Sequence, residues 1–379
     1  TDLRRDPAYT IFYMGVNVGS ALGTILVGYL GETIGWAYGF GLAGIGMVCG
    51  LIIFVIGKPA LRGRGEAPDP ARLAGPAMGV KLETLLYAVG VLAVVVIWAL
   101  IQFQEVIGWL LLASGLVLLL YVFVEAFRHE REVRDRLFAV LFLIALNPVF
   151  WGIYEQSGGS FNLFTDRFVD RSGVPTSLFQ SINPVYIVIL GPIFAWLWTT
   201  LGRRGIEPST PAKFGLGLVQ VGLSFLVLVW GAEMMGGVKV AALLVFLLYL
   251  LQTTGELCLS PVGLSAMNRL APRYMASLIM GAWFLAIAGG EFVAGKIGEA
   301  IGGGASGTMT KEASLAMYDK IGWIGVGLGI AVLIVAPLVK RLMHLDTLRD
   351  EDVGDDLLGQ AEAGYEPQEA GVHPQTRPS

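Results

Sequence analysis

Charged residues and histidines are scarce in this sequence. Only 15% of the 379 residues are charged and three are histidine, whereas 55% are hydrophobic and the mean hydropathy is +0.67. A composition this apolar excludes an ordinary soluble domain and indicates a membrane protein. The abundance of glycine, at 51 residues, favours helices that pack closely in lipid, because small residues let two backbones approach.

Groups that carry chemistry are also few. The histidines His129, His344 and His373 lie outside the apolar runs, so no histidine site is expected within the membrane. Cys49 and Cys258 lie inside apolar runs and do not indicate a redox compartment. Neither a Gly-x-Ser-x-Gly nor a His-Glu-x-x-His motif occurs. We therefore predict that the protein is not an enzyme and that it binds no metal and no cofactor.

Long apolar runs are what the sequence has instead. Ten of them are each close to the ~20 residues that a helix needs to cross a bilayer. The expected fold class is therefore an all-α membrane protein. The expected spans are Tyr9–Leu30, Trp36–Ile56, Thr84–Phe103, Val106–Ala126, Leu137–Phe164, Leu178–Leu201, Lys213–Met235, Val238–Pro261, Tyr274–Ile301 and Ile321–Leu342.

The loops between these runs predict an orientation. Alternate loops hold most of the lysines and arginines, and loops of this kind face the cytoplasm. This distribution predicts a multi-pass protein of the cell membrane with both termini in the cytoplasm. The end of the chain is rich in acids, contains glycine and proline, and shows no apolar period, so we expect it to be disordered. A proline-broken basic stretch after the second run is expected to join two helical bundles.

The polar stretch around Glu155 organises the chain. Asn147, Trp151 and Glu155 are spaced by four residues and Asn162 follows seven later, so all four are expected on one helical face. A carboxylate at membrane depth costs at least a few kcal/mol unless it is paired or wet. Pro148 adds to this polarity by freeing a backbone carbonyl. The stripe therefore indicates a water-filled pathway, although a buried polar cluster between packed helices is the alternative.

Three other runs also carry polar faces at helical spacing. A shared aqueous site fits these three runs and the run of Glu155 better than separate packing clusters, because the four polar faces include two acids, Glu155 and Glu256, together with asparagines. Trp283, taken alone, is typical of a core or lipid-facing residue. The polar positions are Tyr13, Asn17, Ser20 and Thr24; Gln180, Asn183 and Tyr186; and Tyr249, Gln252, Glu256 and Ser260.

Such a site suits a small zwitterion. A carboxylate pairs with an amine, asparagine bonds to peptide carbonyl and N–H groups, and aromatic rings cover apolar side chains. Buried acids can also take up and release protons. The residues alone thus indicate a carrier with titratable acids, without naming its substrate.

Several long motifs occur at Arg4–Ser20, Phe150–Gln156, Asn162–Arg167, Gln180–Pro184, Phe194–Trp198 and Gly255–Ser265. They resemble those of the proton-dependent oligopeptide transporter family of the major facilitator superfamily. Bacterial members usually have fourteen spans, with two extra helices between two six-helix bundles. By this resemblance, the ten spans correspond to the fifth and sixth, the two extra helices and the whole C-terminal bundle. The family's Glu-x-x-Glu-Arg-Phe-x-Tyr-Tyr motif is not found, so the chain resembles an N-terminally truncated fragment.

The resemblance implies a division of the chain into five parts. They comprise the last two helices of an N-terminal bundle, a cytoplasmic linker, two inserted helices with a basic loop, a C-terminal six-helix bundle and an acidic disordered tail. Their ranges are 1–57, 58–83, 84–136, 137–342 and 343–379.

The resemblance also implies roles for individual residues. Glu155 is the acid of proton coupling and gating, and Glu256 receives the amino terminus of the peptide. The remaining substrate-binding residues hold the peptide backbone (Asn17 and Asn183) or form side-chain pockets (Trp151 and Trp283).

One residue departs from the family pattern. Glu291 stands where relatives are expected to have asparagine, on the helix that carries Trp283. Lys296 is poorly placed to pair with it within that helix. Glu291 is either a second titratable group near the outer mouth or a hydrated acid without a role.

The expected function is a proton-coupled symporter that imports di- and tripeptides by alternating access. The proton is its coupling ion, and peptide and lipid are its other partners. We expect a monomer and no nucleic-acid partner. The alternatives are a relative that moves nitrate or another small solute, and a receptor or scaffold of the same fold that transports nothing.

Overall fold

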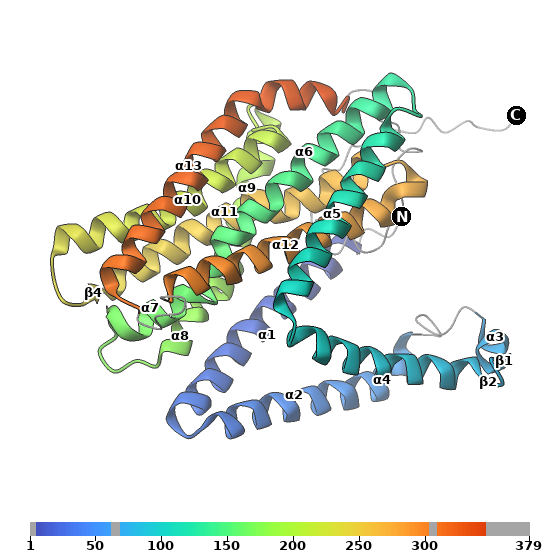
Figure 1. Cartoon of the computed structure of the whole chain (residues 1–379), viewed down its shortest axis with the longest axis horizontal. Helices are drawn as coiled ribbons and strands as arrows, with labels where there is room; N and C mark the ends of the chain where they lie inside the picture. Colours follow the sequence, from blue (N-terminus) through green and yellow to red (C-terminus); the bar gives the residue numbers. More distant parts are fainter. Residues whose placement is uncertain (1–4, 62–68, 303–308, 346–379) are drawn as a thin grey trace, which may run out of the picture. The chain divides into compact units, whose positions relative to one another are not determined.

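The computed structural model describes residues 5–61, 69–302 and 309–345, with the side chains before Gly15 outside this description (Figure 1). Much of the expected acidic tail therefore lies outside the described residues. The chain forms two compact units. One comprises residues 26–116, and the other comprises residues 1–25 together with 117–379.

The smaller unit is built mainly from long apolar helices. It holds the end of α1 (Arg5–Thr33), α2 (Trp36–Gly57), η1 (Lys58–Leu61), α3 (Pro70–Ala74), α4 (Leu82–Ile101) and the start of α5 (Gln104–Ala126). No residue in the most apolar part of α4 is buried. A helix that is apolar all round and exposed is suited to a lipid environment.

A short hairpin precedes α4. Strand β1 (Pro76–Ala77) pairs antiparallel with β2 (Val80–Lys81) around Met78 and Gly79, whose φ angles are 52° and 86°. Positive φ at both central residues is the geometry of a tight hairpin turn. The stretch expected as a plain linker thus contains a helix and a hairpin among its described residues.

The larger unit is a helical bundle. Its main helices are α6 (Arg131–Tyr154), α9 (Ile182–Arg203), α10 (Thr210–Met235), α11 (Ala242–Leu270), α12 (Ala276–Ile301) and α13 (Lys311–Leu342). The shorter elements are η2 (Glu155–Ser157), α7 (Ser160–Phe168), β3 (Val169–Asp170), α8 (Thr176–Gln180), β4 (Val240–Ala241) and η3 (Arg273–Met275). Strands β3 and β4 pair in parallel, with Val169 opposite Val240.

Glycines allow the bundle helices to touch backbone to backbone. A Cβ atom at Gly222 of α10 would lie 2.6 Å from the carbonyl oxygen of Gly322 on α13. A Cβ atom at Gly217 would lie 2.9 Å from the carbonyl oxygen of Gly255 on α11. The prediction that glycine supports close helix packing is confirmed at these contacts.

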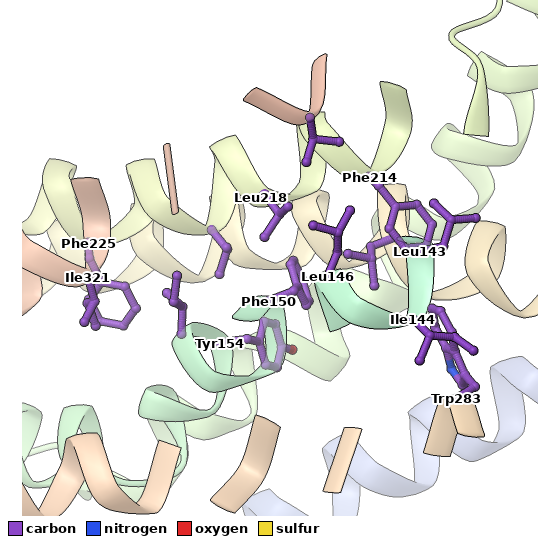
Figure 2. Close-up of a cluster of buried hydrophobic side chains, with 14 of the residues drawn as sticks. Leu143, Ile144, Leu146, Phe150, Tyr154, Phe214, Leu218, Phe225, Trp283 and Ile321 are labelled. Carbon is purple, nitrogen blue, oxygen red and sulfur yellow. The ribbon is translucent and has the colours of Figure 1, made fainter. Parts of the chain in front are cut away.

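A continuous apolar core fills the bundle (Figure 2). Phe150 of α6 and the pair Phe214 and Leu218 of α10 are fully buried in it. Burial of such side chains contributes ~1.5–3 kcal/mol each relative to exposure in water. The same core encloses Trp283 of α12.

Among the residues described, nine helices are long and apolar enough to cross a membrane. They cover the second to the tenth of the expected spans. The first expected span, Tyr9–Leu30, lies on α1, and the side chains of its early residues are outside the description. The all-α membrane fold is therefore confirmed.

Two expected spans are broken rather than continuous. The run Leu137–Phe164 divides at Glu155 into α6, η2 and α7, and the run Leu178–Leu201 divides at Ser181 into the end of α8 and α9. The prediction that Asn162 continues the face of Glu155 was wrong for this reason. The amide N–H groups of Gly158 and Gly159 both bond to the carbonyl of Glu155, which closes a tight turn instead of extending α6.

Candidate functional site

The end of α6 carries the first acid of the site. Glu155 directly follows Tyr154, the last residue of α6, and begins η2. Pro148 lies inside α6 six residues before its end, which removes one helical hydrogen bond. Glu155 is half-buried, and the part of the chain that the structure describes offers it no ion-pair partner.

The second acid, Glu256, lies on α11 and receives two hydrogen bonds. The hydroxyl of Tyr154 donates to Oε2 of Glu256 at 2.6 Å. The side-chain amide of Asn183 on α9 donates to the same oxygen at 3.1 Å. Asn183 also donates to the hydroxyl of Thr253, one turn before Glu256, at 3.1 Å. Three helices that are distant in sequence thus bring their polar faces together at one carboxylate.

Glu155 lies within electrostatic range of Glu256 and of Glu291. The first relationship follows from the predicted convergence of polar faces. The second could not be predicted from spacing within one helix, because it depends on how α12 packs against α6. In this structure Glu291 is exposed and immediately follows Gly290, which packs against α6.

The contact between α6 and α12 is close and partly polar. A Cβ atom at Gly290 would lie 2.7 Å from Cβ of Trp151 and 3.1 Å from the carbonyl oxygen of Pro148. The side-chain amide of Gln156 donates to the backbone carbonyl of Ala294 at 3.0 Å. The side-chain amide of Asn147 donates to the backbone carbonyl of Trp283 at 3.3 Å. These contacts fix Glu155 relative to α12.

On the part of α6 near Glu155, two buried polar atoms have no hydrogen-bond partner among the described residues. They are Oδ1 of the fully buried Asn147 and Nε1 of Trp151 one turn later. The ring of Trp151 is half-buried and lies 5.1 Å from that of Tyr154. Buried polar groups are normally satisfied, so these atoms favour a bound water or ligand group beside α6.

Trp283 is enclosed by protein. Its side chain is 1% exposed and contacts Phe214, with ring centroids 6.1 Å apart. A Cβ atom at Gly263 would lie 2.2 Å from the Trp283 ring, so the indole fits against that glycine. This placement agrees with the core position that the residue alone suggested. The substrate-pocket role implied by the family stays a prediction, as does that of Asn17, which is buried on α1.

Tyr154 is the residue that sequence reasoning missed. It lies inside the stretch Phe150–Gln156, in which roles are expected only for Trp151 and Glu155. Its position seven residues after Asn147 places it on the same helical face, and this spacing could have revealed it.

A separate surface pocket of about 350 Å³ lies beside β3 and β4. It is lined by Val169, Asp170, Arg171, Ser172, Gly173 and Lys239. None of the predicted site residues is among these, so the chemistry around Glu256 identifies the candidate site better than the pocket does. No group of three or more His, Cys, Asp or Glu side chains able to hold a metal occurs in the described residues.

The sequence of this chain is similar to a known family and to known transporters. A family model described as the POT family matches residues 1–306. An uncharacterized transporter, YclF, from Bacillus subtilis (strain 168) is 34% identical over 349 residues, which cover 90% of this chain and 69% of that protein. The peptide transporter YePEPT from Yersinia enterocolitica is 35% identical over 316 residues, which cover 78% of this chain and 62% of that protein.

Solved structures are also similar. A crystal structure of a POT peptide transporter in complex with alafosfalin is 34% identical and aligns with a TM-score of 0.74. The alignment covers 90% of this chain and 69% of that one. The chain thus spans about two thirds of the length of the proteins that it matches.

Proposed function

The chain belongs to the POT family, and we propose that the protein is a proton-coupled symporter that imports di- and tripeptides by alternating access. The observation that carries this proposal is the convergence of Tyr154 and Asn183 on the carboxylate of Glu256. The proposed site includes Asn17, Trp151 and Trp283 as further substrate contacts.

Glu256 is the proposed partner of the peptide amino terminus. It lies in an apolar bundle where opposite charges attract more strongly than in water. The pairing of an ammonium group with a carboxylate by charge-assisted hydrogen bonds is among the stronger polar interactions in proteins. Trp151, half-buried beside the site, offers a surface for an apolar peptide side chain.

Glu155 is the proposed proton-coupling residue. Its neighbours Glu256 and Glu291 are acids as well, and no cation pairs with it among the described residues. Its charge state therefore depends on protons and on the charge of the bound substrate. This dependence is what coupling between a proton and a peptide requires.

The same acids argue against an anion such as nitrate as the substrate. A binding site with Glu256 and a nearby Glu155 repels a small anion unless a cation is added. The acids attract the ammonium group of a peptide without further change. Peptides are thus favoured over the alternative of nitrate transport.

We also propose a location and an organisation. The protein is monomeric and spans the cell membrane, with both termini in the cytoplasm. The distribution of lysine and arginine between alternate loops supports this orientation. Residues 1–57 would close an N-terminal bundle, 58–83 link it to the inserted helices of 84–136, 137–342 form the C-terminal bundle and 343–379 form the tail.

Competition for uptake tests the substrate class. Cells that overproduce the intact protein are given a labelled dipeptide at acidic external pH with an excess of unlabelled dipeptide, tripeptide, free amino acid or nitrate. We expect the di- and tripeptides to compete strongly and the other compounds weakly. Competition by nitrate alone would favour the alternative of a relative that moves nitrate or another small solute. If no compound shows saturable uptake, a receptor or scaffold of the same fold would be favoured.

A further inference from the structure

The hydroxyl of Tyr154 has the shortest hydrogen bond to the candidate amine-binding acid. Tyr154 donates to Oε2 of Glu256 at 2.6 Å, and Asn183 donates to that same oxygen at 3.1 Å. A carboxylate oxygen accepts about two hydrogen bonds. Oε2 is therefore fully occupied, whereas no donor to Oε1 is found among the described residues.

The ring of Tyr154 is held firmly in place. Its side chain is 8% exposed and stacks on the fully buried Phe150, with ring centroids 5.7 Å apart and planes inclined by 22°. Trp151 contacts it from a second direction at 5.1 Å. A rigid aromatic ring with a polar tip directs a hydrogen bond at little cost in side-chain entropy.

The consequence concerns the free oxygen of Glu256. Because one oxygen is tied to α6 and α9, the carboxylate cannot rotate to offer both oxygens equally. We propose that Tyr154 is a positioning residue of the amine site. Together with Asn183 it holds Oε2, so that Oε1 remains available to the ammonium group of a peptide. This inference rests on the proposed peptide-transport function.

A purely structural role for Tyr154 has different consequences. If the hydrogen bond only joined α6 to α11, its loss would weaken transport of every substrate alike. A positioning role affects substrates that carry a free amino group and spares those in which that group is blocked. The ratio between the two substrate types therefore separates the roles.

The test is Tyr154→Phe in the intact protein. This variant removes one hydroxyl and keeps the ring that stacks on Phe150. Half-saturation constants and maximal rates are measured for a dipeptide and for its N-acetylated counterpart. We expect the half-saturation constant of the free dipeptide to rise roughly tenfold, as for the loss of a hydrogen bond to a charged group. The maximal rates of both peptides and the half-saturation constant of the N-acetylated peptide should change little.

A matched control is Tyr318→Phe on α13. Tyr318 is fully buried and donates to the hydroxyl of Ser160 at 3.2 Å, so the variant also removes a buried phenol hydroxyl. It should leave the preference for a free amino group unchanged. In a Glu256→Gln background, Tyr154→Phe should have no further effect on that preference, because its acceptor is no longer a carboxylate.

Two results would overturn the inference in distinguishable ways. If the wild type transports dipeptides but Tyr154→Phe leaves the preference for free amines unchanged, the positioning role alone is wrong. If the wild type takes up no peptide, the proposed function fails and this inference fails with it.

Discussion

Replacement of Gly290 by alanine tests the contact that positions the site. Gly290 lies where α12 meets α6, and a Cβ atom there would come within 2.7 Å of Cβ of Trp151. The next nearest atoms, at 3.1 and 3.2 Å, belong to the backbone of Pro148. Backbone atoms cannot move aside as a flexible side chain can, so the two helices must separate locally.

The expected magnitude follows from two opposing effects. Overpacking of this kind costs about 1–3 kcal/mol. Replacement of glycine by alanine within a helix contributes about 1 kcal/mol in the other direction. Gly289 provides the matched control, because a Cβ atom there meets nothing within 4 Å. Since both variants share the second effect, Gly290→Ala should be less stable than Gly289→Ala by about 1–3 kcal/mol.

The assay is thermal unfolding of both variants in the same detergent. A difference of this size lowers the apparent midpoint of Gly290→Ala by roughly 1–4 °C relative to Gly289→Ala. Because Trp151 is displaced, Gly290→Ala should also raise the half-saturation constant for peptide. Equal midpoints for the two variants would refute the close approach of α12 and α6.

Three other predictions concern charged residues. Glu256→Gln should raise the half-saturation constant most for peptides with a free amino terminus; an equal rise for N-acetylated peptides in the uptake assay would contradict the amine assignment. Glu291→Asn should shift the pH profile of uptake, because it removes a charge within electrostatic range of Glu155; overlapping profiles at equal expression would leave Glu291 without a role. Glu207→Gln should lower the thermal midpoint more than Lys213→Met, because it leaves the buried Lys213 ammonium without its carboxylate partner; the reverse order would contradict this.

The membrane spans and their polar faces could be predicted, because apolar runs and the spacing of polar residues are properties of a single helix. Glu256 and Asn183 each lie on a polar face that has to avoid lipid, and the structure places the Asn183 amide 3.1 Å from Oε2 of Glu256. That Glu291 on α12 is a neighbour of Glu155 could not be predicted in this way. Which helices are neighbours depends on close approaches such as that of Gly290 to the backbone of Pro148, which no spacing within one run encodes.

The break after α6 shows a second limit. Gly158 and Gly159 are also suited to close helix packing in lipid, so their presence does not by itself predict a turn. The structure decides the matter through local hydrogen bonds: both glycine N–H groups bond to the carbonyl of Glu155, and the Ser157 hydroxyl donates to the carbonyl of Tyr154 at 2.8 Å. Tyr154, which bonds to Glu256 on α11, is the last residue of α6, and Glu155 begins a new element.

Gradient-driven uptake by purified protein tests the central claim of proton-coupled peptide import most directly. The intact protein is reconstituted in proteoliposomes with an imposed pH gradient, and accumulation of a labelled dipeptide is compared with peptide counterflow in the absence of a gradient. The wild type should accumulate the dipeptide above equilibrium, and Glu155→Gln should lose this accumulation while retaining much of the counterflow. A wild type that only equilibrates the peptide, or a Glu155→Gln variant that loses both activities equally, would contradict the account.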